Sequence, residues 1–189
     1  MKQAKVLSEK ELKRVLTVIK GRRHSQRDEL VVLLSYLAGL RACEIASLRI
    51  SDVMDEQGNP LDTVYLSSWQ TKGQERQTVM VASRLQKAIA KYVSAERKGA
   101  PTDAPLIRSQ KGGAFTSGTI QNLFKGIYED AGIQGATSHS GRRTFLTTLS
   151  EQGVSVRVIQ KLARHSSLQT TARYIEVNDA VMRKAVELV

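Results

Sequence analysis

The sequence has a single cysteine, Cys43, and lacks an apolar run long enough to cross a membrane. An internal disulfide is therefore impossible, which excludes the disulfide-stapled domains typical of secreted proteins. The longest apolar stretch, residues 30–40, is interrupted by Ser35 and Tyr36 and predicts a buried helix rather than a bilayer span. The first residues are polar and have no apolar signal-peptide core. Together these absences predict a cytoplasmic protein with no membrane partner.

Acidic residues are also scarce: 18 Asp and Glu stand against 29 Lys and Arg, so the 189-residue chain carries a formal charge of +11. Such an excess attracts polyanions, because each phosphate contact releases counterions from a nucleic acid. Charge alone does not separate DNA from RNA or from an anionic membrane, and a basic surface can also be merely solvated. The 41% of hydrophobic residues provide a core for one domain or a compact pair of lobes.

The hydrophobic spacing predicts a mainly α-helical chain with one small antiparallel β-hairpin. Ser8 and Glu11 form a capping-box pattern ahead of a helix that Gly21 ends. The runs TVYLSS and QTVMV alternate like strands and flank an extended tip, WQTKGQER. Further helices are expected over about 28–38, around 44–48, after a capping box at Ser83 and Gln86, over 120–131, before Gly153, after a cap at Ser155, and along a terminal stripe of Val177, Val181, Ala185 and Leu188.

Four short segments hold the polar residues of interest: GLRACE, TKG, HSGRR and LARHSSLQTTARY. Separately each is weak, since an Arg or Lys at such a place is usually solvated. Together they supply the groups needed to bind a phosphate and react with it. Arg41 and Arg142 could each donate forked hydrogen bonds to the phosphate. His139 lies three residues before Arg142, and His165 lies nine residues before Tyr174. The Tyr174 hydroxyl can attack phosphorus, and Lys72 can protonate a departing oxygen.

The order Arg, Lys, His-x-x-Arg, His, Tyr resembles the tyrosine recombinases, also called the phage integrase family. The resemblance extends from about Leu7 to Val177. The segment AGLRACEIASLRISDV is similar to the first arginine box of the family, and HSSLQTTARY is similar to its tyrosine box. The resemblance implies the fold of a tyrosine recombinase catalytic domain and the function of a site-specific DNA recombinase.

The resemblance also implies a role for each group. Tyr174 would attack the scissile phosphate and leave a 3′-phosphotyrosyl linkage with a free 5′-hydroxyl, without metal or cofactor. Lys72 would be the general acid, His139 would assist proton transfer, and Glu44 would orient its neighbours. Three groups would bind and stabilise the phosphate: Arg41, Arg142 and His165.

Two positions depart from the family pattern. Arg164 stands where the family usually has glycine, so its side chain is expected either to alter the turn that presents His165 or to add a DNA contact. Gly141 stands where an apolar packing residue is usual. The residues that we expect to contact DNA are Lys111, Arg143, Arg157, Lys161 and Arg164.

The organisation expected from the resemblance is a single catalytic domain over residues 1–189, with no room for the family's additional N-terminal domain. An excised domain and a naturally short protein remain alternatives. The terminal helix, about 178–189, would pack on its own core or dock on a neighbouring protomer. The expected partners are double-stranded DNA, further copies in a tetramer, and another recombinase. The host would be a bacterium, archaeon or phage, with the protein at the nucleoid.

The main alternative keeps the fold without the chemistry: an accessory DNA-binding protein that regulates or activates other recombinases. A relative of type IB topoisomerases and a nonenzymatic helical repressor are further alternatives. The complete set of catalytic residue types favours an enzyme, because a pure binder has no need of Tyr174 and His165.

Overall fold

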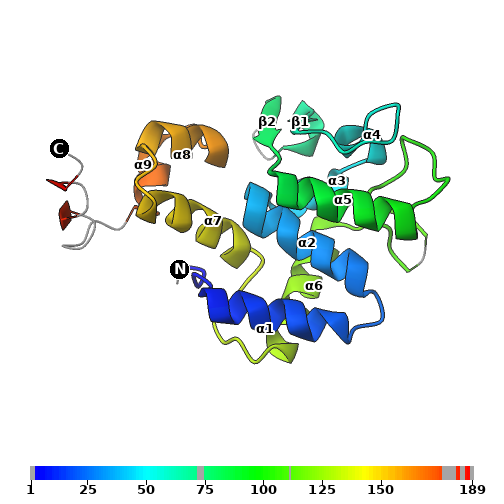
Figure 1. Cartoon of the computed structure of the whole chain (residues 1–189), viewed down its shortest axis with the longest axis horizontal. Coiled ribbons are helices and arrows are strands. Elements are labelled where there is room, and N and C mark those ends of the chain that lie inside the picture. Colours follow the sequence, from blue (N-terminus) through cyan, green and yellow to red (C-terminus); the bar gives the residue numbers. More distant parts are fainter. Residues whose placement is uncertain (1–2, 72–74, 111, 176–181, 184–185, 188–189) are drawn as a thin grey trace.

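Helices form most of the chain in a computed structural model, which describes residues 3–71, 75–110, 112–175, 182–183 and 186–187 (Figure 1). Within these ranges one antiparallel sheet of two strands is present, which confirms the expected mainly helical class. The elements, in order, are α1 (Glu9–Lys20), α2 (Ser25–Ala38), α3 (Ala42–Ser47), α4 (Ile50–Val53), β1 (Thr63–Leu66), the 3-10 helix η1 (Ser68–Gln70), β2 (Gln77–Met80), α5 (Ser83–Glu96), α6 (Ser117–Asp130), α7 (Ser140–Glu151), α8 (Val156–Ala163) and α9 (Leu168–Ala172).

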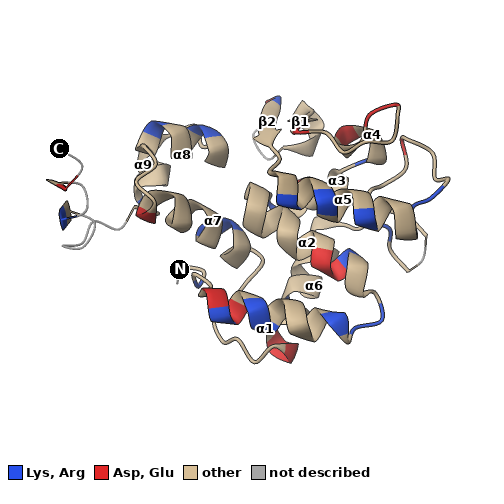
Figure 2. Cartoon of the chain, viewed as in Figure 1, with Lys and Arg blue, Asp and Glu red and all other residues tan. Residues whose placement is uncertain are grey.

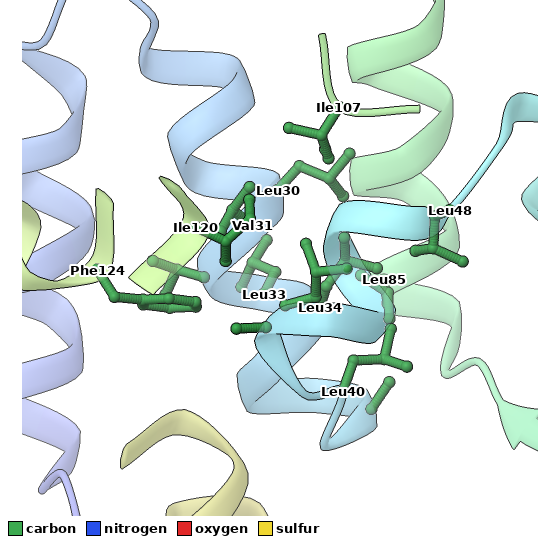
Figure 3. Packing of buried hydrophobic residues seen from close by; sticks show 14 of the residues in the cluster. Leu30, Val31, Leu33, Leu34, Leu40, Leu48, Leu85, Ile107, Ile120 and Phe124 are labelled. Carbon is green, nitrogen blue, oxygen red and sulfur yellow. The ribbon is translucent and has the colours of Figure 1, made fainter. Parts of the chain in front are cut away.

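Helix α2 is the centre of the core and contacts α1, α3, α5 and α7. Leu30 and Leu34 are almost fully buried, and Figure 3 shows them beside Leu85, Ile107 and Ile120 from other segments. Burying each such side chain contributes about 1.5–3 kcal/mol. The prediction of a buried helix over about 28–38 is therefore confirmed, although α2 begins three residues earlier than expected, at Ser25.

Two of the three predicted N-terminal caps are confirmed. The Ser8 hydroxyl accepts a hydrogen bond from the Glu11 amide, and the Glu11 carboxylate accepts one from the Ser8 amide at 2.9 Å. The Ser155 hydroxyl caps α8. The capping box at Ser83 is wrong, because Ser83 is already inside α5 and the preceding Ala82 occupies the cap position. Helix α5 is held instead by its buried apolar face.

The predicted hairpin is also present. Strands β1 and β2 pair with Thr63 opposite Met80 and Leu66 opposite Gln77. Val64, Leu66 and Val79 point into the core, as the alternation predicts. Part of the expected tip forms η1, whereas Lys72 lies outside the described residues.

Helices α7, α8 and α9 lie beside the main core (Figure 1). A second, smaller cluster of buried side chains, Leu146, Ile159 and Ala163, holds α7 and α8 together. The predicted terminal stripe of Val177, Val181, Ala185 and Leu188 falls outside the described residues. Among the residues that are described, none of the helices has both the length and the apolar character needed to cross a bilayer.

Gly141 allows α7 to approach α2 closely. A Cβ atom at this position would lie 2.7 Å from the Ser35 Oγ and 3.3 Å from the Ser35 carbonyl carbon. Ser35 is itself fully buried, so it has little room to move. The absence of an apolar side chain at position 141 is therefore explained by the short distance between the two helices, and the backbone approach takes the place of side-chain packing.

We expect Gly141→Ala to destabilise the fold by about 1–3 kcal/mol, because the added methyl group overpacks the α2–α7 contact. The matched control is Gly126→Ala, which also lies inside a helix but whose Cβ would meet nothing within 4 Å. That control should stabilise the protein by about 0.5–1 kcal/mol, since alanine has the higher helix propensity. Urea unfolding of both variants measures the difference; equal effects would contradict this account of Gly141.

Candidate active site

A buried carboxylate, Glu44, organises the centre of the site. Its side chain is fully buried in α3. One carboxylate oxygen accepts a hydrogen bond from the Arg41 guanidinium at 2.7 Å, and the other accepts from the Arg41 amide and from Arg164, each at 2.8 Å. Burial opposes ionisation, but the cations of Arg164 and Arg41 hold the pKa of Glu44 below its ordinary value. Glu44 is therefore an anion that fixes two arginines.

Arg142 reaches the same place from α7. Its guanidinium is buried and donates hydrogen bonds to the carbonyl oxygens of Gly39 and Ala163. Burial, together with the nearby charges of Arg41 and Arg164, lowers the pKa of Arg142 to about 9, so the group remains a cation at neutral pH. The structure thus brings Arg41 and Arg142 together, although they are about a hundred residues apart in the sequence.

The Arg164 side chain points inward, towards Glu44. Arg164 ends α8 in the left-handed region, with φ 55° and ψ 47°. Its side chain is only 2% exposed, forms an ion pair with Glu44 and donates to the Gly39 carbonyl at 3.1 Å. The guanidinium is thus held mainly by other parts of the protein, although Arg164 also belongs to the lining of the hollow described below. Of the two alternatives for this residue, the geometry favours the structural one, and the DNA contact stays a prediction.

His165 follows directly and is half-buried. Its Nδ1 lies 3.0 Å from the Thr171 hydroxyl. Hydrogen bonds in both directions between Gln160 and the His165 backbone fix the loop. Burial, and then the cations of Arg142, Arg41 and Arg164, lower the pKa of His165 to about 4. The imidazole is therefore neutral at pH 7.

Tyr174 lies against the imidazole. The two ring centroids are 5.6 Å apart and the rings are tilted by 25°. The phenol ring also packs on the small cluster formed by α7 and α8. Helix α9 and the turn after it position this residue, because the Tyr174 amide bonds to the Thr171 carbonyl at 2.9 Å. The segment that carries Thr171 therefore orients both the histidine and the tyrosine.

A hollow of about 660 Å³ lies over these groups. One wall comes from Arg41, Thr71 and the start of β2, and the other from α8 and the loop after it. Figure 1 shows α8 and the hairpin facing one another, and Figure 2 shows that α8 carries basic but no acidic residues. Exposed Arg157 and Lys161 belong to this wall. Of the side chains that line the hollow, four are basic and one, Glu75, is acidic, so the hollow is cationic overall.

The remaining predicted residues lie elsewhere. Lys72 and Lys111 fall outside the described residues. His139 is exposed and precedes the first residue of α7, so it flanks the helix that carries Arg142. Arg143 is half-buried, and its Nε has no hydrogen-bond partner among the residues described. Arg142 and Tyr174 are not among the residues that line the hollow.

Three supporting groups were not predicted from the sequence. The Gly39 carbonyl accepts from two arginines, Gln160 holds the backbone of His165, and Thr171 contacts its ring. A backbone carbonyl leaves no mark in a sequence. Thr171, the fourth residue of α9, is fully buried, but nothing in the polar sequence of this short helix indicates that burial.

Comparisons with known proteins agree with this geometry. The model of the phage integrase family matches residues 5–180. Tyrosine recombinase XerA of Pyrococcus furiosus is 32% identical over 97% of this chain and 61% of its own length. Tyrosine recombinase XerC of Methylobacterium sp. is 35% identical over 85% of this chain and 49% of its own length. This chain therefore spans about three fifths, or less, of these two relatives.

Solved structures show the same fold. The crystal structure of XerA recombinase superimposes with a TM-score of 0.78 at 28% identity and covers all of this chain and 66% of its own. The XerH site-specific recombinase bound to difH substrate gives a TM-score of 0.73 at 22% identity, over 98% of this chain and 54% of its own. The expected recombinase catalytic-domain fold is confirmed by the first of these matches together with the family model.

We expect the His165 imidazole to titrate near pH 4 in the free protein, because burial and three cations disfavour its charged form. Since an unfolded histidine titrates near ~6.5, protonation of the unfolded chain would weaken the fold as pH falls from about 6.5 towards 4. NMR titration measures the midpoint, and His165→Gln identifies the resonance. Adding DNA should raise the midpoint by offsetting the arginine charges; a midpoint of the free protein near 6.5 would contradict the cationic environment.

Proposed function

Because this chain belongs to the phage integrase family, we propose that it is the catalytic domain of a site-specific recombinase that cleaves and rejoins DNA through Tyr174. The observation that carries the proposal is one cluster of four groups. Arg41 and His165 line the hollow, Tyr174 stacks on His165, and Arg142 lies close enough to Arg41 and Tyr174 to interact electrostatically with both. Residues 1–189 would act as a single catalytic unit.

The proposed reaction is a transesterification at phosphorus. The Tyr174 oxygen forms a bond to the phosphorus of the DNA backbone and passes its proton to a base, a transfer that His139 would assist, while the bond to the 5′ oxygen breaks. A general acid protonates that oxygen, and we assign this role to Lys72. The products are a 3′-phosphotyrosyl ester and a free 5′-hydroxyl, which attacks in the reverse step to rejoin a strand. Because the ester conserves the energy of the broken bond, no cofactor is required.

The cations supply stabilisation where charge develops. Negative charge grows on the non-bridging oxygens during displacement, and guanidinium groups fixed beforehand stabilise it without reorganising. Arg41 has one of its donors on Glu44, and the remaining donors are available to a phosphate in the hollow. The neutral His165 would donate a hydrogen bond from Nε2 when its Nδ1 accepts from Thr171. His139, at the start of α7, would assist proton transfer.

The proposed partner is double-stranded DNA. The protein would bind it as a tetramer that contains further copies of this chain or another recombinase. Arg157 and Lys161 support this assignment, since both are exposed on the wall of the hollow. Arg143 and Lys111 remain further candidates for phosphate contacts. The accessory-protein alternative uses the same surface without the chemical step, so an assay of covalent chemistry separates the two.

Tyr174→Phe should abolish formation of a covalent protein–DNA adduct on a nicked suicide substrate, because it removes the attacking oxygen. The matched control is Tyr65→Phe, which deletes the hydroxyl of an exposed tyrosine in β1. Wild type and the control should yield an adduct that survives denaturant, measured by gel shift. A wild-type chain that binds DNA containing its correct site without forming an adduct would support the accessory protein, and an adduct that persists in Tyr174→Phe would refute the nucleophile.

Removing the charge of Arg157 or Lys161 should weaken DNA binding to a similar degree for all sequences. Each lost phosphate contact is expected to reduce the slope of log affinity against log salt by about 1. Lys125→Gln is the control, because Lys125 is exposed on α6 and outside the hollow. Fluorescence anisotropy at several salt concentrations measures the slopes, and slopes equal to that of the control would place the DNA on another surface.

A further inference from the structure

We propose that Arg164 is a positioning residue that locks the loop carrying His165 onto the segment carrying Arg41, through Glu44. The inference rests on the function proposed above and assigns that site a further residue. It would act through its neighbours, because its side chain is only 2% exposed and has almost no surface for the DNA.

The backbone gives the first reason. Arg164 is the one non-glycine residue with a positive φ in the part of the chain that the structure describes. A left-handed conformation is unfavourable for any residue with a Cβ atom, whereas glycine adopts it freely. Such strain persists only where surrounding contacts hold it, and it is concentrated at functional sites. Here the strained residue directly precedes the candidate catalytic histidine.

The side chain supplies the contacts that hold this backbone. One terminal nitrogen donates to Glu44 at 2.8 Å and to the Gly39 carbonyl at 3.1 Å, and the other donates to the Leu162 carbonyl at 3.1 Å. A single guanidinium therefore joins the end of α2, the start of α3 and the end of α8. Glycine at position 164 would keep the turn but lose every one of these bonds.

The charge of Arg164 matters as much as its hydrogen bonds. Three guanidinium groups, of Arg41, Arg142 and Arg164, share one carboxylate, Glu44, so two positive charges remain for a ligand. Without Arg164 only one would remain. A phosphodiester is a monoanion that gains negative charge as the nucleophile attacks. Arg164 thus prevents Glu44 from cancelling the field that Arg41 and Arg142 direct at the phosphate.

The test is single-turnover cleavage of the nicked substrate at increasing DNA concentration, for Arg164→Gly, Arg164→Ala and Arg164→Lys. The maximal rate should fall about tenfold to a hundredfold in the glycine variant, with the half-saturating concentration changed less than about threefold. The alanine variant keeps the strained backbone without the bonds and should be no faster. Lysine restores the charge, so part of the rate should return. The control is Arg84→Ala, an exposed arginine of α5 outside the hollow.

A maximal rate of Arg164→Gly equal to wild type would overturn the proposal. A loss of rate that lysine does not restore at all would also overturn it, because the shared charge would then have no effect. The link through Glu44 is tested by combining Arg164→Gly with Glu44→Gln. We expect the double variant to lose less than the product of the two single losses, since the carboxylate that needs neutralising is gone. Multiplicative losses would contradict the link.

Thermal unfolding provides a readout that needs no DNA. It is measured for wild type, Arg164→Gly, Glu44→Gln and the double variant. Coupled shifts in Tm between positions 44 and 164 would support the lock, and additive shifts would overturn it. If wild type forms no adduct while the Tm shifts are coupled, the proposed function fails and the lock remains. If wild type cleaves and the shifts are additive, the lock fails and the proposed function remains.

Discussion

The burial of the Glu44 carboxylate is the constraint on which the rest of the site depends. A fully buried anion is strongly unfavourable unless charges and hydrogen bonds compensate it. Arg41 and Arg164 provide that compensation, and in doing so they become fixed themselves. Removing one partner of such a group typically costs about 3–5 kcal/mol, because a buried charge is left uncompensated. Two segments that are 120 residues apart in the sequence are therefore held together by one side chain.

Gly39 adds a second constraint from the backbone. It ends α2 with φ +60°, and a Cβ atom there would lie 2.8 Å from the Phe145 ring. A larger residue would therefore be strained and would also clash. Its carbonyl accepts from both Arg142 and Arg164. Helix α2, at the centre of the core, thus ends at the point where two arginines meet, which ties the site to the core.

Much of the fold follows from local patterns in the sequence. The cap at Ser8, the buried helix over about 28–38 and the alternation of the hairpin each follow from short-range physics, and each is confirmed. The prediction of a cap at Ser83 is wrong because a pattern of residue types does not show where a helix begins when the packing of its apolar face determines its position. The residue types of the site could be predicted from the sequence, but their arrangement in space could not. A sequence shows which groups are available, whereas convergence depends on tertiary packing.

Arg164 illustrates that limit most clearly. From the sequence alone a basic residue beside a candidate catalytic histidine could face the DNA or the core with equal plausibility. The deciding fact is the buried Glu44, whose need for a second cation is visible only after folding. Gly141 shows the complementary case, in which a missing side chain is explained by the approach of Ser35 from another helix. In both cases the informative partner lies more than a hundred residues away.

The same electrostatics couple the stability of the site to its ligand. Burial lowers the pKa of both Arg142 and His165, and the neighbouring arginine charges lower them further. The free site therefore holds mutually repelling cations that Glu44 offsets only in part. An anion in the hollow would relieve this repulsion, so any phosphate that binds the folded chain would also stabilise it. The repulsion among the buried arginines is thus the source of the attraction for the phosphate. Because the packing of the core holds these arginines close together, it contributes directly to the proposed chemistry.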